Sequence, residues 1–169
     1  MKKLSESKTR LSTILSLKDR ETLVRAMLND VLNAVTQSKM VDQTIVVSPD
    51  YVALREICPP KVKIIRENGA GDLNMALKCA VEYSMRNGAT SLLILPADIP
   101  LIEKSDVDLI ISSASDTGVV IVPSKDGSGT NALMLTPADV IATAFGMNSF
   151  QSHLERAGVS KATVKVLPI

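Results

Sequence analysis

Asp98 is the residue best placed for chemistry, because it is a single carboxylate within an apolar, proline-rich stretch. It follows the apolar run at residues 92–95 and is the only charged side chain between Arg86 and Glu103. Such a run is typical of a buried parallel strand, and open α/β sheets bind ligands at the carboxyl ends of their strands. A carboxylate there suits Mg²⁺, which takes one or two protein carboxylates plus substrate phosphates. Alternatively, Asp98 caps the helix expected near Glu103.

The amino-terminal segment, residues 1–15, is a second candidate because it combines cations with small hydroxyl side chains. Lys2, Lys8 and Arg10 alternate there with serine and threonine. Charge-assisted hydrogen bonds from such side chains suit a phosphate group. The alternative is a solvated terminus without a ligand.

Composition excludes several classes of protein. The chain has 169 residues, 46% of them apolar, and a net charge of +1, which favours one globular domain and gives no electrostatic reason to expect a nucleic-acid or membrane partner. Two Tyr, two Phe and no Trp leave little aromatic surface for stacking single-stranded bases. Cys58 and Cys79 match no zinc or redox spacing and are expected to pack as small hydrophobes. We expect a cytoplasmic protein, since no apolar run is long enough to span a membrane.

Hydrophobic periodicity predicts alternating helices and strands. Helices are expected from the N-cap Ser16 to about residue 37, and over residues 51–57, 73–86, 105–113 and 149–157, the last with Ser149 as N-cap; residues 137–143 form a short helix at most. Strands are expected over residues 43–47, 62–65, 92–95, 118–122, 132–135 and 163–167. This order indicates an α/β protein with a mostly parallel sheet, to which the 118–135 region adds an antiparallel strand.

Five segments, in order, resemble the 2-phospho-L-lactate guanylyltransferase family, including its bacterial relatives that use phosphoenolpyruvate. The segments are Lys-Thr-Arg-Leu-Ser at 8–12, Asp-Leu-Asn-Met-Ala-Leu at 72–77, Leu-Pro-Ala-Asp-Ile-Pro-Leu at 95–101, Gly-Thr-Asn-Ala-Leu at 129–133, and residues 145–153, which end in His153. The resemblance implies a three-layer α/β/α, Rossmann-like fold of the nucleotide-diphospho-sugar transferase type. It also implies transfer of GMP from GTP to a phosphorylated three-carbon acid in biosynthesis of the factor-420 deazaflavin coenzyme.

The resemblance also assigns roles to residues. Lys8 and Arg10 would neutralise the triphosphate with help from Lys2, and Asp98 would hold Mg²⁺. The loop at residues 67–74 would recognise guanosine. Its assigned members are Gly69, Asp72 and Asn74. The acid would bind at Thr130, Asn131, Gly146 and Ser149, and His153, one turn from Ser149, either touches the acid or is structural.

The chain departs from the family pattern at both ends. Family members have a buried strand before the basic loop and a second acidic segment after residue 167, and this sequence shows neither. The expectation is therefore a single nucleotidyltransferase domain that lacks these two pieces. A homodimer is compatible with the resemblance. A molybdopterin guanylyltransferase is an alternative, although its glycine-rich first loop is not found here, and a non-catalytic nucleotide-binding protein is another.

Overall fold

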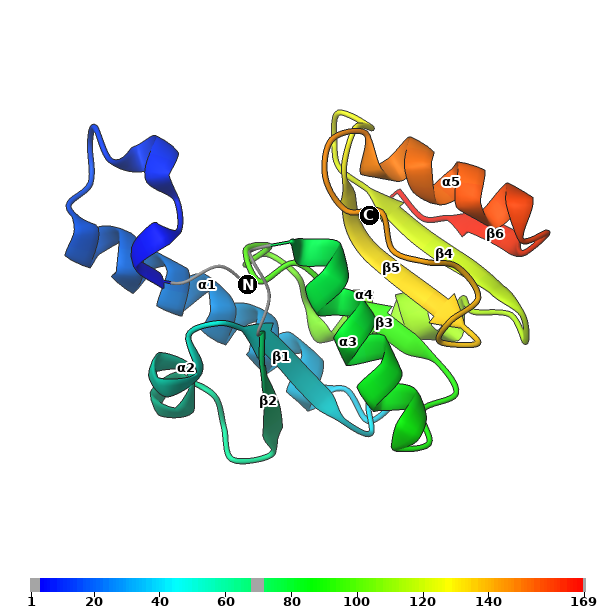
Figure 1. Ribbon diagram of the computed structural model, residues 1–169, viewed down its shortest axis with the longest axis horizontal. Coiled ribbons are helices and arrows are strands. Elements are labelled where there is room, and N and C mark those ends of the chain that lie inside the picture. The colour runs from blue at the N-terminus through cyan, green and yellow to red at the C-terminus, as the bar shows by residue number, and fades with distance from the viewer. Residues whose placement is uncertain (1–3, 68–71, 169) are drawn as a thin grey trace. The chain divides into compact units, whose positions relative to one another are not determined.

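A computed structural model describes residues 4–67 and 72–168 (Figure 1). The chain divides into two compact units. The amino-terminal unit comprises Met1–Gly71 and Ala97–Val107, and the sheet unit comprises Asp72–Pro96 and Asp108–Ile169. The stretch around Asp98 therefore belongs to the same unit as the basic loop, although it follows a strand of the other unit in the sequence.

The amino-terminal unit is built on one long helix and a pair of parallel strands. Its elements are the short 3-10 helices η1 (Leu4–Glu6) and η2 (Thr9–Leu11), then α1 (Leu17–Gln37), β1 (Thr44–Ser48), α2 (Tyr51–Ile57) and β2 (Val62–Arg66). β1 pairs with β2 so that Thr44 lies opposite Val62. Leu28 and Leu32 of α1 pack with Leu54 of α2 against these strands. The four-residue spacing of apolar side chains along α1 thus supplies the core of this unit.

The sheet unit contains four strands and three helices. Its elements are α3 (Leu73–Arg86), β3 (Leu92–Ile94), the part of α4 (Lys104–Ser112) from Asp108 onward, β4 (Gly118–Pro123), β5 (Thr130–Thr136), α5 (Ser149–Val159) and β6 (Thr163–Val166). The strand order is β3-β5-β4-β6. β5 is antiparallel to both of its neighbours, whereas β6 is parallel to β4. Three strands therefore share one direction, and the added antiparallel strand expected from the sequence is confirmed as β5.

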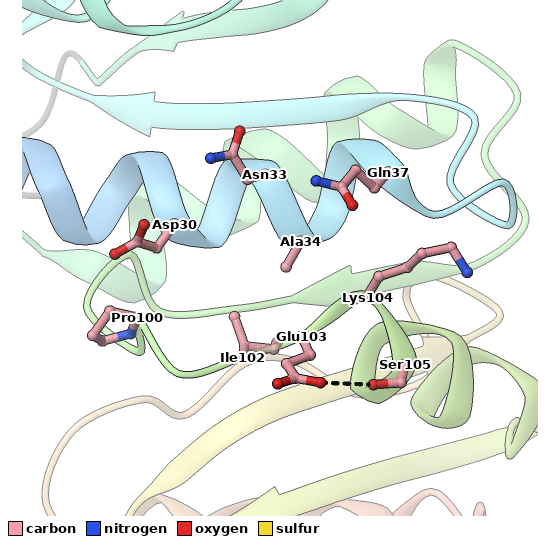
Figure 2. Close-up of a pocket in the computed structure, with 9 residues that line it drawn as sticks. All are labelled: Asp30, Asn33, Ala34, Gln37, Pro100, Ile102, Glu103, Lys104 and Ser105. Atoms are coloured by element: carbon pink, nitrogen blue, oxygen red, sulfur yellow. Dashed lines mark hydrogen bonds between the residues drawn. The ribbon is translucent and has the colours of Figure 1, made fainter.

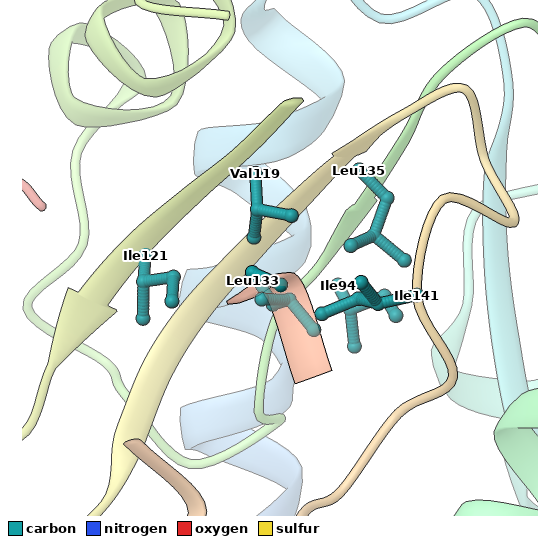
Figure 3. Packing of buried hydrophobic residues seen from close by; sticks show 7 residues of the cluster. Ile94, Val119, Ile121, Leu133, Leu135 and Ile141 are labelled. Carbon is teal, nitrogen blue, oxygen red and sulfur yellow. The ribbon is translucent and has the colours of Figure 1, made fainter. Parts of the chain in front are cut away.

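Both faces of this sheet are covered by apolar side chains. On one face, Val119 and Ile121 of β4 and Leu133 and Leu135 of β5 pack with Ile94 (Figure 3). Residues from α5, α3 and the 141–145 loop complete that cluster, and residues of α4 pack on the opposite face. Side chains alternate between faces along each strand, so continuous apolar strands require a layer on each side. The three-layer α/β/α arrangement follows.

The observed elements match the expected ones to within a residue or two, with differences at their ends. The N-cap of α5 is Asn148, whose φ of 54° is left-handed, so the prediction that Ser149 caps this helix is wrong. Residues 137–143 form bends, turns and irregular chain in place of a short helix. Cys58 packs into the amino-terminal core as expected, whereas Cys79 is exposed. Among the residues that the structure describes, no helix has the length and apolarity needed to cross a membrane.

Gly118, at the start of β4, provides a test of the sheet. A Cβ at this position would lie 2.6 Å from the Ser115 hydroxyl oxygen and 2.8 Å from the Thr163 carbonyl oxygen. We expect Gly118→Ala to lower the free energy of unfolding by about 1–3 kcal/mol, because the β4–β6 pair must shift. Gly158→Ala is the matched control, since nothing lies within 4 Å of its added Cβ in α5, and it should stabilise by roughly 0.5–1 kcal/mol. Urea unfolding of both variants checks this; equal stabilities would contradict it.

Candidate active site

Lys8 and Asp98 form an ion pair across 90 residues of sequence. The Lys8 Nζ lies 2.8 Å from the Asp98 Oδ2, and the two side chains are 32% and 50% exposed. The basic loop therefore contacts Asp98 through Lys8. Arg10 lies two residues further on in η2 with an exposed side chain. The pair is accessible to a ligand, because neither partner is buried.

The fold holds Lys8 in place through the residues before it. Leu4 is buried against Val24 and Met27 of α1. Arg20, also on α1, donates from Nη1 to the Ser7 carbonyl oxygen at 3.1 Å. Lys8 itself has a left-handed backbone with φ 52°, which is costly for a residue with a Cβ. Strained backbone of this kind persists only where surrounding contacts fix it.

Asp98 does not cap α4. The helix begins six positions later at Lys104, and its first turn is closed by Asp106, whose Oδ2 accepts from the Glu103 N–H at 2.8 Å. A third-position side chain that accepts from the N–H of the N-cap residue is one of the two hydrogen bonds of a capping box. The capping alternative for Asp98 is therefore wrong, and its carboxylate faces Lys8.

In the sheet unit, Thr130, Ser149 and His153 form a buried cluster. The Thr130 Oγ1 lies 3.0 Å from His153 Nδ1 and accepts from the Ser149 hydroxyl at 3.2 Å. Their exposed fractions are 6%, 2% and 0% respectively. Thr130 begins β5, and the other two lie one turn apart on α5. The structure thus joins two of the predicted acid-binding residues, Thr130 and Ser149, through direct contact.

The loop before α5 is held at three consecutive residues. Arg156 donates from Nη1 to the Thr143 carbonyl, and His153 Nε2 accepts from the Ala144 N–H at 2.9 Å. Asn74 then binds both backbone groups of Phe145: its Oδ1 accepts from the N–H at 2.8 Å and its Nδ2 donates to the carbonyl at 2.9 Å. These contacts fix the loop immediately before Gly146.

Gly146 follows this fixed segment and is exposed. Its φ of +141° lies in a region that side chains disfavour. Asn131 is half-buried in β5, next to Thr130. The backbone around Gly146 is therefore both fixed and accessible, which suits close approach by a small ligand.

The residues assigned to guanosine have structural partners or lie outside the description. Asp72 is the N-cap of α3, and its carboxylate accepts from the Asn74 N–H at 2.9 Å. The Asn74 side-chain amide is used by Phe145. Gly69 lies outside the described residues, and so does Lys2, which was assigned to the triphosphate. Sequence reasoning missed the Asn74–Phe145 and Arg156–Thr143 contacts, although Asn74 and Phe145 both belong to segments that carried the resemblance.

The pKa of His153 is lowered to about 4, first because burial disfavours the imidazolium and second because the Arg156 charge repels it. The folded protein therefore takes up this proton less readily than the unfolded chain, whose His pKa is near 6.5. His153 contributes stability above pH 6.5 that is lost as the pH falls towards 4.

We expect the loss to reach about 3 kcal/mol by pH 4. Urea unfolding of the native protein and of His153→Gln, which does not titrate, isolates this contribution because the other groups cancel. As the pH falls from 7.5 to 4.5, the free energy of unfolding of the native protein should decrease relative to that of the variant. A pH-independent difference would contradict the low pKa.

A hollow of about 420 Å³ lies between α1 and the Pro100–Ser105 segment (Figure 2). Its lining is largely polar, with Asp30, Asn33 and Gln37 on α1 facing Glu103 and Lys104. None of the predicted site residues lines it. We therefore place the candidate site at the Lys8–Asp98 pair and at the Thr130–Ser149–His153 cluster, each within its own unit.

The fold resembles that of two solved structures. A crystal structure assigned as a nucleotide-diphospho-sugar transferase from Desulfovibrio desulfuricans G20 superposes with a TM-score of 0.81 at 19% identity, covering 99% of this chain and 77% of that one. A manganese complex of Rv0371C from Mycobacterium tuberculosis H37Rv superposes with a TM-score of 0.59 at 18% identity, covering 85% and 75%. Both likenesses show that the chain shares this fold.

Sequence comparison gives the family. Residues 1–167 match the model of a protein family that is described as "Guanylyl transferase CofC like". The chain is 35% identical over 157 residues to phosphoenolpyruvate guanylyltransferase of Sphaerobacter thermophilus, covering 93% of this chain and 75% of that protein. It is 38% identical over 155 residues to 2-phospho-L-lactate guanylyltransferase of Methanobrevibacter smithii, covering 92% and 67%. The chain belongs to the family of CofC-like guanylyl transferases.

Proposed function

We propose that this protein transfers GMP from GTP to a phosphorylated three-carbon acid, phosphoenolpyruvate or 2-phospho-L-lactate, in biosynthesis of the factor-420 deazaflavin coenzyme. Family membership supports the reaction class. The observation that carries the assignment to this chain is the accessible Lys8–Asp98 pair, which joins two segments of the family resemblance. Because the reaction consumes GTP, we expect it to take place in the cytoplasm.

In this reaction, a phosphate oxygen of the acid attacks the α-phosphorus of GTP. A new P–O bond joins the acid to GMP, and the bond to the β-phosphate breaks, releasing pyrophosphate. The attacking oxygen is already anionic at neutral pH, so no general base is needed. Catalysis then consists of positioning the reactants and stabilising charge on the leaving group.

Lys8 and Arg10 suit charge stabilisation. Both lie at η2, on a loop that Leu4 and Arg20 hold, and both extend cationic side chains from exposed or half-buried positions. An exposed ion pair contributes less than about 1 kcal/mol. The Lys8 ammonium can therefore exchange Asp98 for a triphosphate oxygen at little energetic cost.

Asp98 fits a divalent metal, and specifically Mg²⁺, as a single protein ligand. The described residues contain no cluster of three or more His, Cys, Asp or Glu side chains that could enclose an ion. Mg²⁺ does not require one, because it keeps several waters and takes substrate phosphates beside one or two carboxylates. When bound, the ion would polarise phosphoryl oxygens. Asp98 would hold it, since its carboxylate is half exposed.

The acid would bind near the buried cluster of the sheet unit. Thr130 and the α5 amino terminus at Ser149 offer hydrogen-bond donors, Asn131 follows Thr130 in β5, and Gly146 lies in the loop before α5. Helix amino termini favour anions. The proposal that the loop at residues 67–74 recognises guanosine comes from the resemblance. Within that segment, Asp72 caps α3 and Asn74 binds the backbone of Phe145.

The proposed function is tested by incubating the protein with labelled GTP, Mg²⁺ and each acid in turn. We expect equimolar pyrophosphate and a guanylylated acid with at least one of the two. GTP binding without product from either acid would support a non-catalytic nucleotide-binding protein.

Lys8→Met and Asp98→Asn test the ion pair. Each removes one charge, and we expect turnover to fall by about 10²-fold or more, as for a lost electrostatic contact to the transition state. Stability should change by less than about 1 kcal/mol, because the pair is exposed. Lys39→Met and Asp42→Asn are matched controls, since both side chains are exposed on the loop after α1. Steady-state kinetics and urea unfolding of all four variants check this; full turnover in Lys8→Met would exclude its role.

A further inference from the structure

The two ring nitrogens of His153 have distinct and fixed roles. Nε2 lies 2.9 Å from the backbone nitrogen of Ala144. A backbone N–H can only donate, so Nε2 must carry the lone pair and Nδ1 the proton. The Phe145 ring packs edge-on against the imidazole with centroids 4.9 Å apart, and the ring is fully buried. The tautomer is therefore set by the loop that the ring contacts.

The direction of the Thr130 hydroxyl follows from this tautomer. Nδ1–H donates to Thr130 Oγ1 at 3.0 Å, and the Ser149 hydroxyl donates to the same oxygen at 3.2 Å. These two bonds use both lone pairs of Thr130. The Thr130 proton can go to neither His153 nor Ser149, because both are its donors.

We infer that His153 is a positioning residue that keeps the Thr130 hydroxyl proton away from His153 and Ser149, so that Thr130 donates to an anionic oxygen of the acid substrate. This inference rests on the proposed function. The Ser149 proton is already committed to Thr130, so Ser149 would contribute its backbone N–H at the start of α5. The hydroxyl cluster then presents donors to the ligand, which favours fully ionised carboxylate or phosphate oxygens over neutral groups.

The arrangement also explains the three contacts on the preceding loop. Arg156 at Thr143 and Asn74 at Phe145 flank Ala144, whose N–H sets the tautomer. Movement of Ala144 would free Nε2 to take the proton and would turn Nδ1 into an acceptor. The contacts that fix the loop backbone therefore also fix the direction in which the Thr130 hydroxyl donates its hydrogen bond.

The tautomer is directly measurable, because the chain contains one histidine. Long-range ¹H–¹⁵N spectra at pH 7 should show Nδ1 protonated and Nε2 bare. A proton on Nε2, or rapid exchange between tautomers, would overturn the inference without any substitution.

Substitutions test the consequence for binding, with dissociation constants for phosphoenolpyruvate, 2-phospho-L-lactate and GTP measured by calorimetry. Thr130→Val should weaken acid binding by about tenfold or more, as for a lost hydrogen bond to a charged group. Thr130→Ser should bind the acid almost as tightly as the native protein does. Ser149→Ala should weaken acid binding less than Thr130→Val does. GTP binding should be unchanged throughout, which reports that the variants are folded.

A double-mutant cycle separates positioning from general stability. If His153 acts through Thr130, then His153→Phe should weaken acid binding in the native background and add little in Thr130→Val. Additive effects would overturn the inference, as would equal losses for GTP and acid. If His153→Phe fails to fold, the spectra and the Thr130 variants still decide. Native protein that binds neither acid also overturns it, whereas binding without turnover counts against the proposed function alone.

Discussion

Strand β5 is the element on which the sheet unit depends, because it pairs with β3 on one side and β4 on the other. Leu133 and Leu135 on one face and Ala132 and Met134 on the other are all buried. A strand covered on both faces cannot slip by one residue without exchanging the two sets of side chains. This fixed register places Thr130, its first residue, against α5 and hence against His153 and Ser149.

The sequence was sufficient to predict most elements because their periodicity is local. The four-residue apolar repeat predicted α1, and continuous apolar runs predicted the buried strands. Contacts between distant segments required other information. The family resemblance assigned Lys8 to the triphosphate and Asp98 to Mg²⁺, whereas nothing in the sequence pairs the Asn74 amide with the backbone of Phe145. A side-chain amide has many suitable partners, and only the fold selects one.

Helix ends were also predicted less well than helices. Ser149 has the residue type of an N-cap, but Asn148 tolerates the left-handed backbone that this turn requires and takes that position instead. Ser149 then moves into the first turn, where its hydroxyl bonds Thr130. The same residue type thus serves two different roles according to a shift of one position, which local sequence rules do not distinguish.

The two parts of the candidate site use different electrostatics. Lys8 and Arg10 carry full charges at accessible positions, whereas Thr130, Ser149 and neutral His153 supply only buried dipoles. The interaction between exposed charges decays over a screening length of about 10 Å at 0.1 M salt, which shortens as salt is added, whereas buried groups are screened much less. If the two parts bind the substrates of the proposed function, rising ionic strength should therefore weaken binding of the triphosphate while leaving affinity for the small acid largely intact, so that the salt concentration of the medium sets which of the two substrates limits the reaction.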